Sequence, residues 1–388
     1  MTASLAQEER RDRSELPVQI ALGSAFRVTE GYGSTESAAA YARARELCYK
    51  LGATSELLPV LNGMWSYHII YGNLQAAQEL ATECLRIAER ESDPGLLVQA
   101  CRTAGATDFW LGKFQGCREH MERGAGLYDV ERDEAKVGWF AVDGLVGCLI
   151  YQAWAAWFLG YPEQARELAR RAVEHARALK HHHTLAFALI YASTTHLSRR
   201  EMPLAQADGE EVLRLSIEQA FPQLAPMGQV VAGAGIAGQG DPDRGLERID
   251  EGIAAWSRLG SKLFITLSLG WRADALLLGS RNTEAAATVV EALRIADETG
   301  ERFYEAELHR LHGQALLGRD DVVAERDFAN AMEIARAQMA KSLKLRCGTG
   351  PRPVVAVAGA HCRSAGAVGA GLRPLYRRLR HAGPDRSA

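Results

Sequence analysis

The sequence lacks the features that would place the chain in a membrane, outside the cell or on a nucleic acid. Its seven cysteines form no Cys-x-x-Cys pair and no histidine stands at zinc-ligand spacing, so we interpret them as free thiols of a reducing compartment. Lys and Arg number 45 against 48 Asp and Glu, a balance that gives no general attraction to polyphosphate or anionic lipid. The N-terminal letters MTASLAQEERRDRSE contain no apolar core of a secretory signal. The most apolar stretch, 144–160, falls short of the roughly 20 residues that cross a bilayer, and we expect a cytoplasmic protein.

A repeat is the main feature that the sequence does contain. An apolar segment ends in Gly, a short polar turn follows, and a small residue stands five positions after the Gly. Consecutive units lie about 40 residues apart, with one spacing near 48. The units are Gly33 to Ala38, Gly72 to Ala77, Gly112 to Cys117, Gly160 to Ala165 and Gly240 to Gly245, with Arg200 to Ala205 and Arg319 to Ala324 as variants. A further small residue follows seven positions later, at Cys84, Gly124, Ala172, Val212, Gly252, Ala292 and Ala331.

This spacing predicts a stack of helix pairs. Residues i and i+7 share one face of a helix, so small side chains there let the paired helix approach closely. A Gly between the helices supplies the positive φ that ends the first helix, and Pro162, Pro203 and Pro242 suit the start of the second. We therefore predict an all-α fold, a right-handed α-solenoid of about eight tetratricopeptide-like helix pairs over residues 14–346, preceded by a flexible segment, 1–13. The period overlaps that of HEAT repeats, but small residues at the helix crossing favour tetratricopeptide-like pairs over these or an irregular bundle.

Several segments carry a resemblance to one bacterial family. They are YARARELCYKLG (41–52), FWLGKF (109–114), WFLGYPEQA (157–165), LAFAL (185–189), IEQAFP (217–222), TGERFYEAELHRLHG (299–313) and AKSLKLR (340–346). Together they resemble the C-terminal repeat region of class III adenylate/guanylate cyclases fused to a predicted signalling ATPase of the STAND or AAA type. The repeat type also resembles the inducer-sensing part of transcriptional activators related to the maltose regulator. This resemblance implies a region that senses a ligand or partner and controls the catalytic parts.

The catalytic parts themselves are not recognisable in the sequence. No Gly-x-x-x-x-Gly-Lys-Ser/Thr phosphate loop occurs, and Gly260-Ser261-Lys262 lacks both the earlier Gly and the hydroxyl after Lys. There is also no pair of metal-binding aspartates on a strand hairpin, which a cyclase would require. We expect a non-catalytic scaffold without cofactor or metal that regulates a cyclase or ATPase partner; the alternative is a cyclase fragment without its catalytic domain. Sequence-specific RNA binding would need a basic groove, against which the balanced charge argues.

The composition changes abruptly after Arg346. The segment 347–388 holds seven Arg and one acidic residue, Asp385, and is rich in Gly, Ala, Pro and Val, which GC-rich codons give when read out of frame. Back-translated with permitted codons and read one base later, it can spell a string that resembles the family's own ending. We expect this tail to be non-native or disordered, the product of a shifted reading frame.

Aromatic residues of the first helices are the candidate binding residues. In tetratricopeptide arrays the first helix of each pair lines the concave face, where a peptide, protein domain or small effector would bind. Aromatics with polar neighbours are the better surface candidates, although some must fill the core. The predicted groove residues are Trp65, Tyr67, His68, Tyr71, Trp110, Tyr191, Trp271, Arg272, Asp274, Tyr304 and His309.

Histidines offer two weaker candidates. We interpret His181, His182 and His183 as a solvated turn, because adjacent helical side chains point in different directions and no other ligand stands nearby. His309 and His312 share one helix face near Glu305 and Glu307 and could hold a metal or relay protons; since His312 falls at a helix crossing, we favour a structural role. No Ser, His and Asp grouping can be nominated from the sequence.

Overall fold

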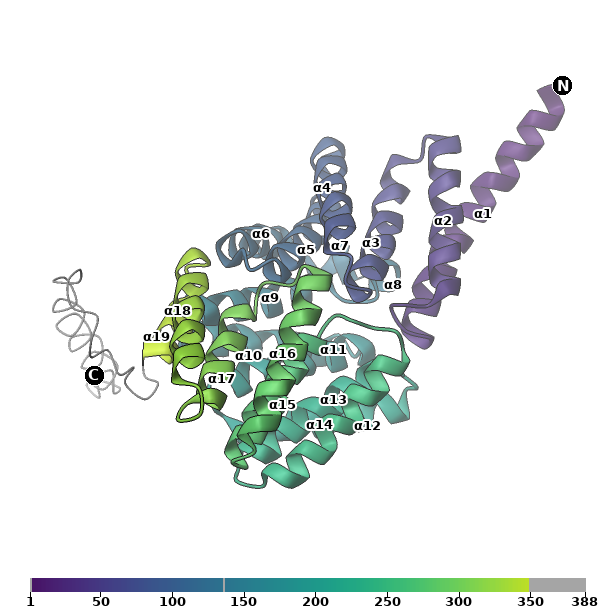
Figure 1. The fold of residues 1–388 in the computed structure, drawn as a ribbon. Helices are drawn as coiled ribbons and strands as arrows, with labels where there is room; N and C mark the ends of the chain where they lie inside the picture. Colours follow the sequence, from purple (N-terminus) through teal and green to yellow (C-terminus); the bar gives the residue numbers. More distant parts are fainter. Residues whose placement is uncertain (1, 135–136, 349–388) are drawn as a thin grey trace, which may run out of the picture. The chain divides into compact units, whose positions relative to one another are not determined.

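A computed structural model of the chain describes residues 2–134 and 137–348. Within these residues the regular elements are all α-helices, joined by short turns (Figure 1). Their bounds are α1 (Thr2–Thr29), α2 (Thr35–Leu51), α3 (Thr54–Ile70), α4 (Leu74–Glu91), α5 (Pro94–Trp110), α6 (Phe114–Leu127), α7 (Val130–Asp133), α8 (Val137–Phe140), α9 (Gly144–Phe158), α10 (Pro162–Ala178), α11 (His182–Ser198), α12 (Met202–Glu218), α13 (Leu224–Gly238), α14 (Pro242–Arg258), α15 (Ile265–Leu278), α16 (Asn282–Thr299), α17 (Glu305–Leu316), α18 (Asp321–Ala337) and α19 (Lys341–Gly348).

The long helices form successive pairs, as the repeat spacing predicts. The described residues contain eight such pairs, from α1/α2 to α17/α18, followed by α19 in the position of another first helix. The paired helices contact each other along the chain, and the first helices of neighbouring pairs also contact each other, as α9, α11, α13 and α15 do in turn. The all-α prediction and the tetratricopeptide-like solenoid are therefore confirmed.

The two helices of a pair occupy different layers because their sequences differ in polarity. First helices are apolar almost all round; α9, for example, reads GLVGCLIYQAWAAWF and is buried at every position except Leu145. Second helices are amphipathic: α10 buries the stripe Ala165, Leu168, Ala169 and Ala172 and exposes its charged residues. A helix that is apolar all round must be covered on all sides, whereas a striped helix covers one side and faces water with the other. The first helices consequently form the inner layer.

Small residues stand where the paired helices touch. Ala172 and Ala292 have no exposed surface, and a Cβ on Gly252 would lie 2.8 Å from the carbonyl oxygen of Pro226 on the preceding helix. The turn glycines have the predicted positive φ at most units, but in the first pair Gly31, with φ of 105°, takes this role instead of the predicted Gly33. The spacing assigned the turn two residues late because the first pair has a longer connection.

The one long repeat spacing corresponds to an insertion. Helices α7 and α8 lie between the third and fourth pairs, and α8 contacts α1 and α3 of the first two pairs. The inserted segment also supplies Phe140 and Val142 to the interior, where both are buried. The extra residues therefore fill the space inside the N-terminal half of the array.

Successive turns of the solenoid contact each other. The carbonyl oxygen of Ile70, at the end of α3, accepts a 2.8 Å hydrogen bond from the backbone N–H of Lys262, just before α15. The Trp157 carbonyl near the end of α9 likewise accepts a 2.5 Å hydrogen bond from the Ser342 hydroxyl of α19. In both cases the partners lie five helix pairs apart, so the superhelix completes a turn in about five pairs. These bonds satisfy helix-end carbonyls that would otherwise need water.

Two predicted boundaries need comment. The segment 1–13 was predicted to be flexible, but residues 2–13 belong to α1, and Lys50 of α2 forms ion pairs with Glu8 at 2.5 Å and Asp12 at 2.6 Å. These charges therefore pair with the neighbouring helix. The predicted frameshift tail, 347–388, falls outside the described residues except for Cys347 and Gly348, which end α19.

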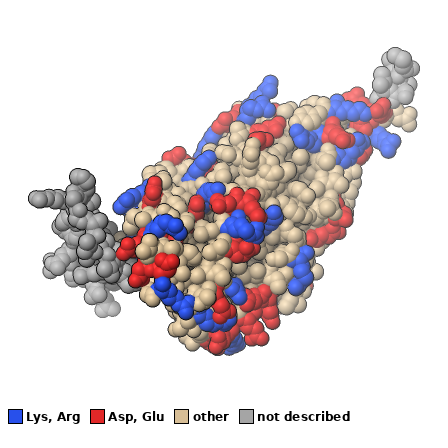
Figure 2. Space-filling view, viewed as in Figure 1, with Lys and Arg blue, Asp and Glu red and all other residues tan. Residues whose placement is uncertain are grey.

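The surface of the array is charged in both senses. On the face seen in Figure 2, acidic and basic side chains are interspersed with uncharged areas between them, in keeping with the balanced composition. Among the helices that the structure describes, none is both long enough and apolar enough to cross a membrane.

Candidate functional site

Three cavities line up inside the solenoid along one face of α11. The tyrosine cavity is lined by Tyr32, Trp65, Ser66, Ile69, Ile70, Arg102, Phe140, Val142, Tyr151, Phe187, Tyr191 and Leu263. The aromatic cavity is lined by Trp154, Trp157, Phe158, Thr194, Thr195, Ser198, Leu267, Trp271, Phe303 and Tyr304. The charged cavity is lined by Leu197, Ser198, Arg200, Met202, Ala234, Ala237, Gly238, Trp271, Asp274, Ala275, Leu278, Tyr304, Glu307 and Arg346.

The charged cavity brings together residues from six helices and their turns. Arg200, in the turn after α11, forms a 2.6 Å ion pair with Asp274 of α15. Arg346 of α19 forms a 2.8 Å ion pair with Glu307 of α17 and a 2.8 Å hydrogen bond with the Ser198 carbonyl at the end of α11. The empty space at these side chains, including the part open to solvent, is about 460 Å³. Groups far apart in the sequence therefore meet at one charged surface inside the fold.

The two carboxylates of this cavity have different environments. Burial alone would raise the pKa of Glu307, but Arg310 at 2.9 Å and Arg346 outweigh burial and lower that pKa to about 2. Glu307 is thus a permanent anion with two fixed partners. The Arg200 and Asp274 side chains are 49% and 26% exposed, and an ion pair so accessible to water is weak. Arg200 can therefore exchange Asp274 for a negatively charged group of a ligand at little cost in free energy.

Aromatic rings form the wall between the charged and aromatic cavities. Trp271 and Tyr304 line both cavities, and Arg346 stacks on the ring of Trp157 at 4.8 Å. The Trp154 indole N–H donates a 2.8 Å hydrogen bond to the Tyr191 carbonyl, which fixes the ring against α11. The aromatic cavity, with about 300 Å³ of empty space including the part open to solvent, offers apolar rings beside a cation. Such a surface suits an apolar side chain next to a polar or charged backbone group.

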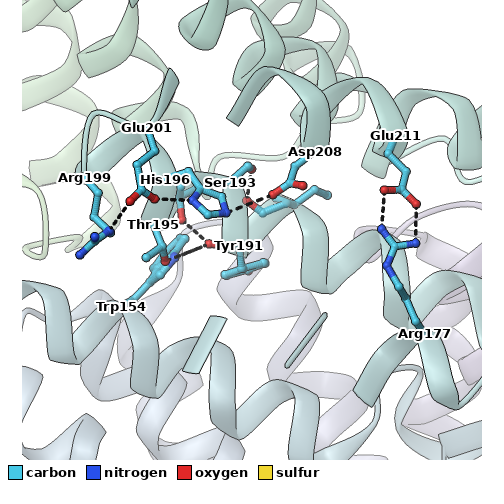
Figure 3. Close-up of polar contacts among 12 residues, drawn as sticks. Trp154, Arg177, Tyr191, Ser193, Thr195, His196, Arg199, Glu201, Asp208 and Glu211 are labelled. Atoms are coloured by element: carbon cyan, nitrogen blue, oxygen red, sulfur yellow. Dashed lines mark hydrogen bonds and ion pairs between the residues drawn. The ribbon is translucent and has the colours of Figure 1, made fainter. Parts of the chain in front are cut away.

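A polar network fixes the end of α11 that faces these cavities (Figure 3). His196 Nδ1 lies 2.7 Å from Glu201, and Arg199 pairs with the same carboxylate at 2.9 Å. Asp208 of α12 lies 3.7 Å from His196 Nε2, and burial raises its pKa to about 6. Arg177, in the last turn of α10, binds Glu211 of α12 at 2.6 Å. The network holds α11 to α12 and so keeps the lining face of α11 in place.

Five of the predicted groove residues line the cavities. Trp65 and Tyr191 belong to the tyrosine cavity, where the Trp65 indole N–H donates to the Thr107 hydroxyl at 2.8 Å. Trp271, Asp274 and Tyr304 belong to the charged cavity. All are buried except Asp274, so the surface that they form is internal and is reached through the turns of the superhelix.

The other six predicted residues lie elsewhere. Trp110 is fully buried against Phe109 and Phe303 and lines none of the three cavities. Arg272 points to the second helices, where it binds Asp250 at 2.6 Å. Tyr67, His68 and Tyr71 form a half-buried cluster at the end of α3, in which the Tyr71 hydroxyl donates to the Gly33 carbonyl at 3.0 Å and burial lowers the pKa of His68.

The last of the six, His309, has a structural partner. His309 and His312 both place Nδ1 near the carboxylate of Asp327, at 3.0 and 2.6 Å. Asp327 belongs to α18, so the two histidines tie α17 to its paired helix. Among the described residues no group of three or more His, Cys, Asp or Glu side chains is arranged to hold a metal ion.

The histidine turn differs from its prediction. His183 is buried, and its Nδ1 lies 3.0 Å from the Ala141 carbonyl, to which it donates. Burial lowers its pKa to about 3, so the ring is neutral, and its Nε2 lies 3.4 Å from the Tyr32 hydroxyl. His181 caps the start of α11, and only His182 is exposed as predicted. The insertion that covers His183 comes from a distant part of the sequence, so the pattern at 181–183 could not reveal it.

Sequence reasoning missed the charged residues of the cavities. Arg200 is notable in the sequence only because it stands where other repeats have the turn glycine, and Glu307 only because it is close to His309. Arg102 and Arg346 carry no signal in the sequence. A charged residue in an amphipathic pattern is ordinarily solvated, and only the closure of the superhelix buries Arg102 and Glu307 and brings Arg200 and Arg346 to the charged cavity.

These features define a tetratricopeptide-like helical solenoid with an internal, mixed aromatic and charged site. No family model matches the chain. A curated protein of Rhizobium meliloti (strain 1021), described as uncharacterized, is 23% identical over 352 residues, which cover 89% of this chain and 34% of that protein. The chain thus spans about a third of the length of this relative.

Solved structures share the fold. A Rap protein complexed with competence and sporulation factor superimposes with a TM-score of 0.59 at 13% identity, over 86% of this chain and 89% of that chain. A signal transduction ATPase with numerous domains from Pyrococcus horikoshii, which has a tetratricopeptide repeat sensor, gives a TM-score of 0.40 at 12% identity, over 79% of this chain and 52% of that chain. At these identities the likeness to the Rap protein establishes the fold.

Proposed function

We propose that the chain is a non-catalytic sensor that binds a short peptide or small effector inside the solenoid and passes the signal to a protein partner. The observation that carries this proposal is the row of three cavities along α11. Each cavity combines apolar rings with polar or charged groups, the mixture typical of ligand-binding sites. Their walls come from helices of both superhelical turns.

The length of the row suits a short extended chain. Phe187 lines the tyrosine cavity and Ser198 lines the charged cavity, with Tyr191 and Thr194 between them. Eleven residues of helix rise about 16 Å, which an extended peptide of about five residues also covers. Side chains of such a peptide would enter the cavities, and one charged group would take the place of Asp274 beside Arg200.

Transmission of the signal follows from the origin of the walls. Arg346 bridges Glu307 and the end of α11, so a ligand between α11 and α17 competes for the contacts that hold α19. A shift of α19 would in turn change the surface that the last helix pair offers to a partner protein. The likeness of the fold to a Rap protein solved with a signalling factor supports this reading.

The finer part of the proposal concerns the partner. The segments 299–313 and 340–346 resemble the repeat region of cyclase and ATPase fusions, and we expect a class III cyclase or a STAND-type ATPase as the regulated protein. The much greater length of the Rhizobium meliloti relative is compatible with a region that works beside other domains. Sequencing the DNA on both sides of the coding region, and co-purifying the neighbouring products with the tagged chain, tests this part.

The alternative is that the chain is a cyclase fragment without its catalytic domain. In that case no ligand should bind and stabilise it. Purified chain incubated with ATP or GTP and Mg²⁺ or Mn²⁺ should form no cyclic nucleotide under either reading. Formation of cyclic nucleotide would contradict the non-catalytic assignment.

Ligand binding is tested with a synthetic library of peptides of about five residues, scored by the rise in melting temperature. We expect active peptides to stabilise the wild-type chain and to lose this effect in Trp271→Leu and Arg200→Gln. Arg272→Gln is the matched control, because its side chain is adjacent in sequence but points to the second helices. Peptides that stabilise Trp271→Leu as much as the wild type would place the site elsewhere.

A further inference from the structure

Two arginines are buried side by side near the tyrosine cavity without a carboxylate partner. Arg27 of α1 is 2% exposed and Arg102 of α5 is 4% exposed. Both direct a guanidinium nitrogen to the same amide oxygen of Asn62, at 3.5 Å from Arg27 and 3.4 Å from Arg102. Neither forms an ion pair with any Asp or Glu of residues 2–134 and 137–348. Two positive charges thus share one neutral acceptor in the interior.

The remaining partners of both arginines are also neutral. Arg27 donates to the Ser66 hydroxyl at 3.1 Å and the Trp139 carbonyl at 3.5 Å, while its buried Nε has no acceptor in the described part of the chain. Arg102 donates to Gln99 at 2.9 Å. Burial lowers the pKa of Arg102, and the charge of Arg27 lowers it further. A buried charge is costly unless an opposite charge accompanies it, and residues 2–134 and 137–348 supply none to these two arginines.

The cavity beside Arg102 is lined by the guanidinium and by hydroxyl groups. Ser66 donates to the Asn62 carbonyl at 3.0 Å, whereas the Tyr32 hydroxyl, which keeps its proton because burial raises its pKa to about 12, has a long 3.4 Å contact with His183 Nε2 and can turn to a ligand. The Trp110 indole donates to the Tyr151 hydroxyl at 3.2 Å, and Tyr151 lies 3.2 Å from the Tyr191 hydroxyl. The Tyr151 hydroxyl accepts from the indole and shares a hydrogen bond with Tyr191, in which either hydroxyl can be the donor. Guanidinium and hydroxyl donors without an anionic acceptor form a site for an anion.

We propose that the tyrosine cavity binds the carboxylate of a small organic acid with a short apolar body. Arg102 would bind the carboxylate, with Arg27 behind Ser66 adding its charge and the tyrosine hydroxyls completing the hydrogen bonds. The opposite walls are apolar, formed by Ile69, Phe140 and Phe187 among others, and the empty space at the cavity, including the part open to solvent, is about 470 Å³. Tyr32 is the one lining residue that is not fully buried, so the ligand enters beside it.

A carboxylate fits this donor set better than a phosphate does. Arg102 is the one guanidinium group among the lining residues and the rest of the lining is apolar, hydroxylic or an indole, which matches one flat anionic group on an apolar body. This cavity is one end of the row to which the proposed function assigns the peptide, but a small acid can occupy it without touching Trp271 or Arg200 at the other end. Loss of the proposed function at Trp271 and loss of this site are distinguishable by their own variants.

The experiment measures the melting temperature and the tryptophan fluorescence of the full chain with hexanoate, benzoate, the amides of both acids and inorganic phosphate. Trp65 reports directly, because its ring lies 5.9 Å from the Arg102 guanidinium carbon. We expect both carboxylates to stabilise the wild type in proportion to concentration and the amides to have no effect. Arg102→Gln and Arg27→Gln should weaken carboxylate binding about tenfold or more, the loss typical of a charge-assisted hydrogen bond.

Two variants outside the tyrosine cavity serve as controls. Arg123→Gln removes an exposed arginine on α6, and Trp271→Leu alters the other site; both should bind the carboxylates as the wild type does. If the buried variants do not fold, Tyr32→Phe, at the half-exposed rim, should weaken binding several-fold in a folded protein. Equal stabilisation by acids and amides, a stronger response to phosphate than to carboxylates, or unchanged binding by Arg102→Gln would each overturn the proposal.

Discussion

The backbone N–H of Arg302 donates a 2.9 Å hydrogen bond to the carbonyl oxygen of Trp110, five helix pairs earlier in the chain. The two residues belong to successive turns of the superhelix. An open repeat array is stabilised mostly by contacts between neighbouring pairs, so that its ends can unfold separately. Here the later turns also hold the earlier ones. We therefore expect more cooperative unfolding than nearest-neighbour stacking alone would give, and the following predictions examine the contacts responsible.

Gly72→Ala should disturb the contact between superhelical turns. Gly72 has φ of 73°, and an added Cβ would lie 2.4 Å from Thr299 Cγ2 of the later turn. Gly318, with φ of 74°, has nothing within 4 Å of such a Cβ, so Gly318→Ala measures the backbone strain alone. We expect Gly72→Ala to cost roughly 1–3 kcal/mol more than Gly318→Ala, by overpacking. Equal losses in denaturant unfolding would mean that the turns separate at no cost.

Ala292→Phe should force α16 away from its paired helix. Ala292 has no exposed surface and stands at the predicted helix crossing, and a large ring there is expected to cost roughly 1–3 kcal/mol. Ala172→Phe should behave alike in α10. The matched control is Ala287→Phe, an exposed position of the same helix α16, where the melting temperature should hardly change. If Ala292→Phe and Ala287→Phe have the same melting temperature, the helix crossing at Ala292 is not tightly packed.

Glu301 should make stability fall as pH rises. It is 2% exposed and accepts a hydrogen bond from the Thr266 hydroxyl, and burial raises its pKa from 4.5 to about 7. Since the folded chain holds this proton more tightly than the unfolded chain, its stabilising effect is complete below pH 4.5 and is lost as pH rises through 7. We expect Glu301→Gln to exceed the wild type above pH 8 by up to about 3 kcal/mol. The exposed Glu298→Gln should keep the wild-type pH profile.

Glu307 should act in the opposite sense. Although burial opposes ionisation, Arg310 and Arg346 lower its pKa to about 2, so its stabilising effect is present above pH 4.5 and is lost as pH falls toward 2. Glu307→Gln leaves buried positive charge uncompensated and should cost about 3–5 kcal/mol at neutral pH. Hydrogen exchange of α19 should rise with it, because Arg346 loses its anchor. Exposed Glu333→Gln is the control, and equal exchange of α19 in both variants would argue against this anchor.

The sequence by itself determined the helix pairs and their order. The recurrence of a turn glycine and a small residue, as at Gly72 and Ala77, depends on contacts within one pair or between neighbouring pairs, so its signal lies within one repeat. For the same reason Ala172 and Ala292 were assigned correctly to buried crossings. Local spacing is enough where the physical cause, the approach of two adjacent helices, is itself local.

Only the tertiary structure decided which residues form the site. Trp110 and Trp271 have the same pattern in the sequence, yet Trp110 is sealed in the core while Trp271 lines two cavities. Likewise, no sequence pattern near Arg102 indicates that its side chain is buried without a carboxylate partner. These outcomes depend on how far the superhelix turns per pair, a small rotation that accumulates over five pairs before the chain meets itself. The periodicity of the sequence indicates that each helix pair is rotated relative to the one before it. The size of that rotation is set by the packing of all the pairs together.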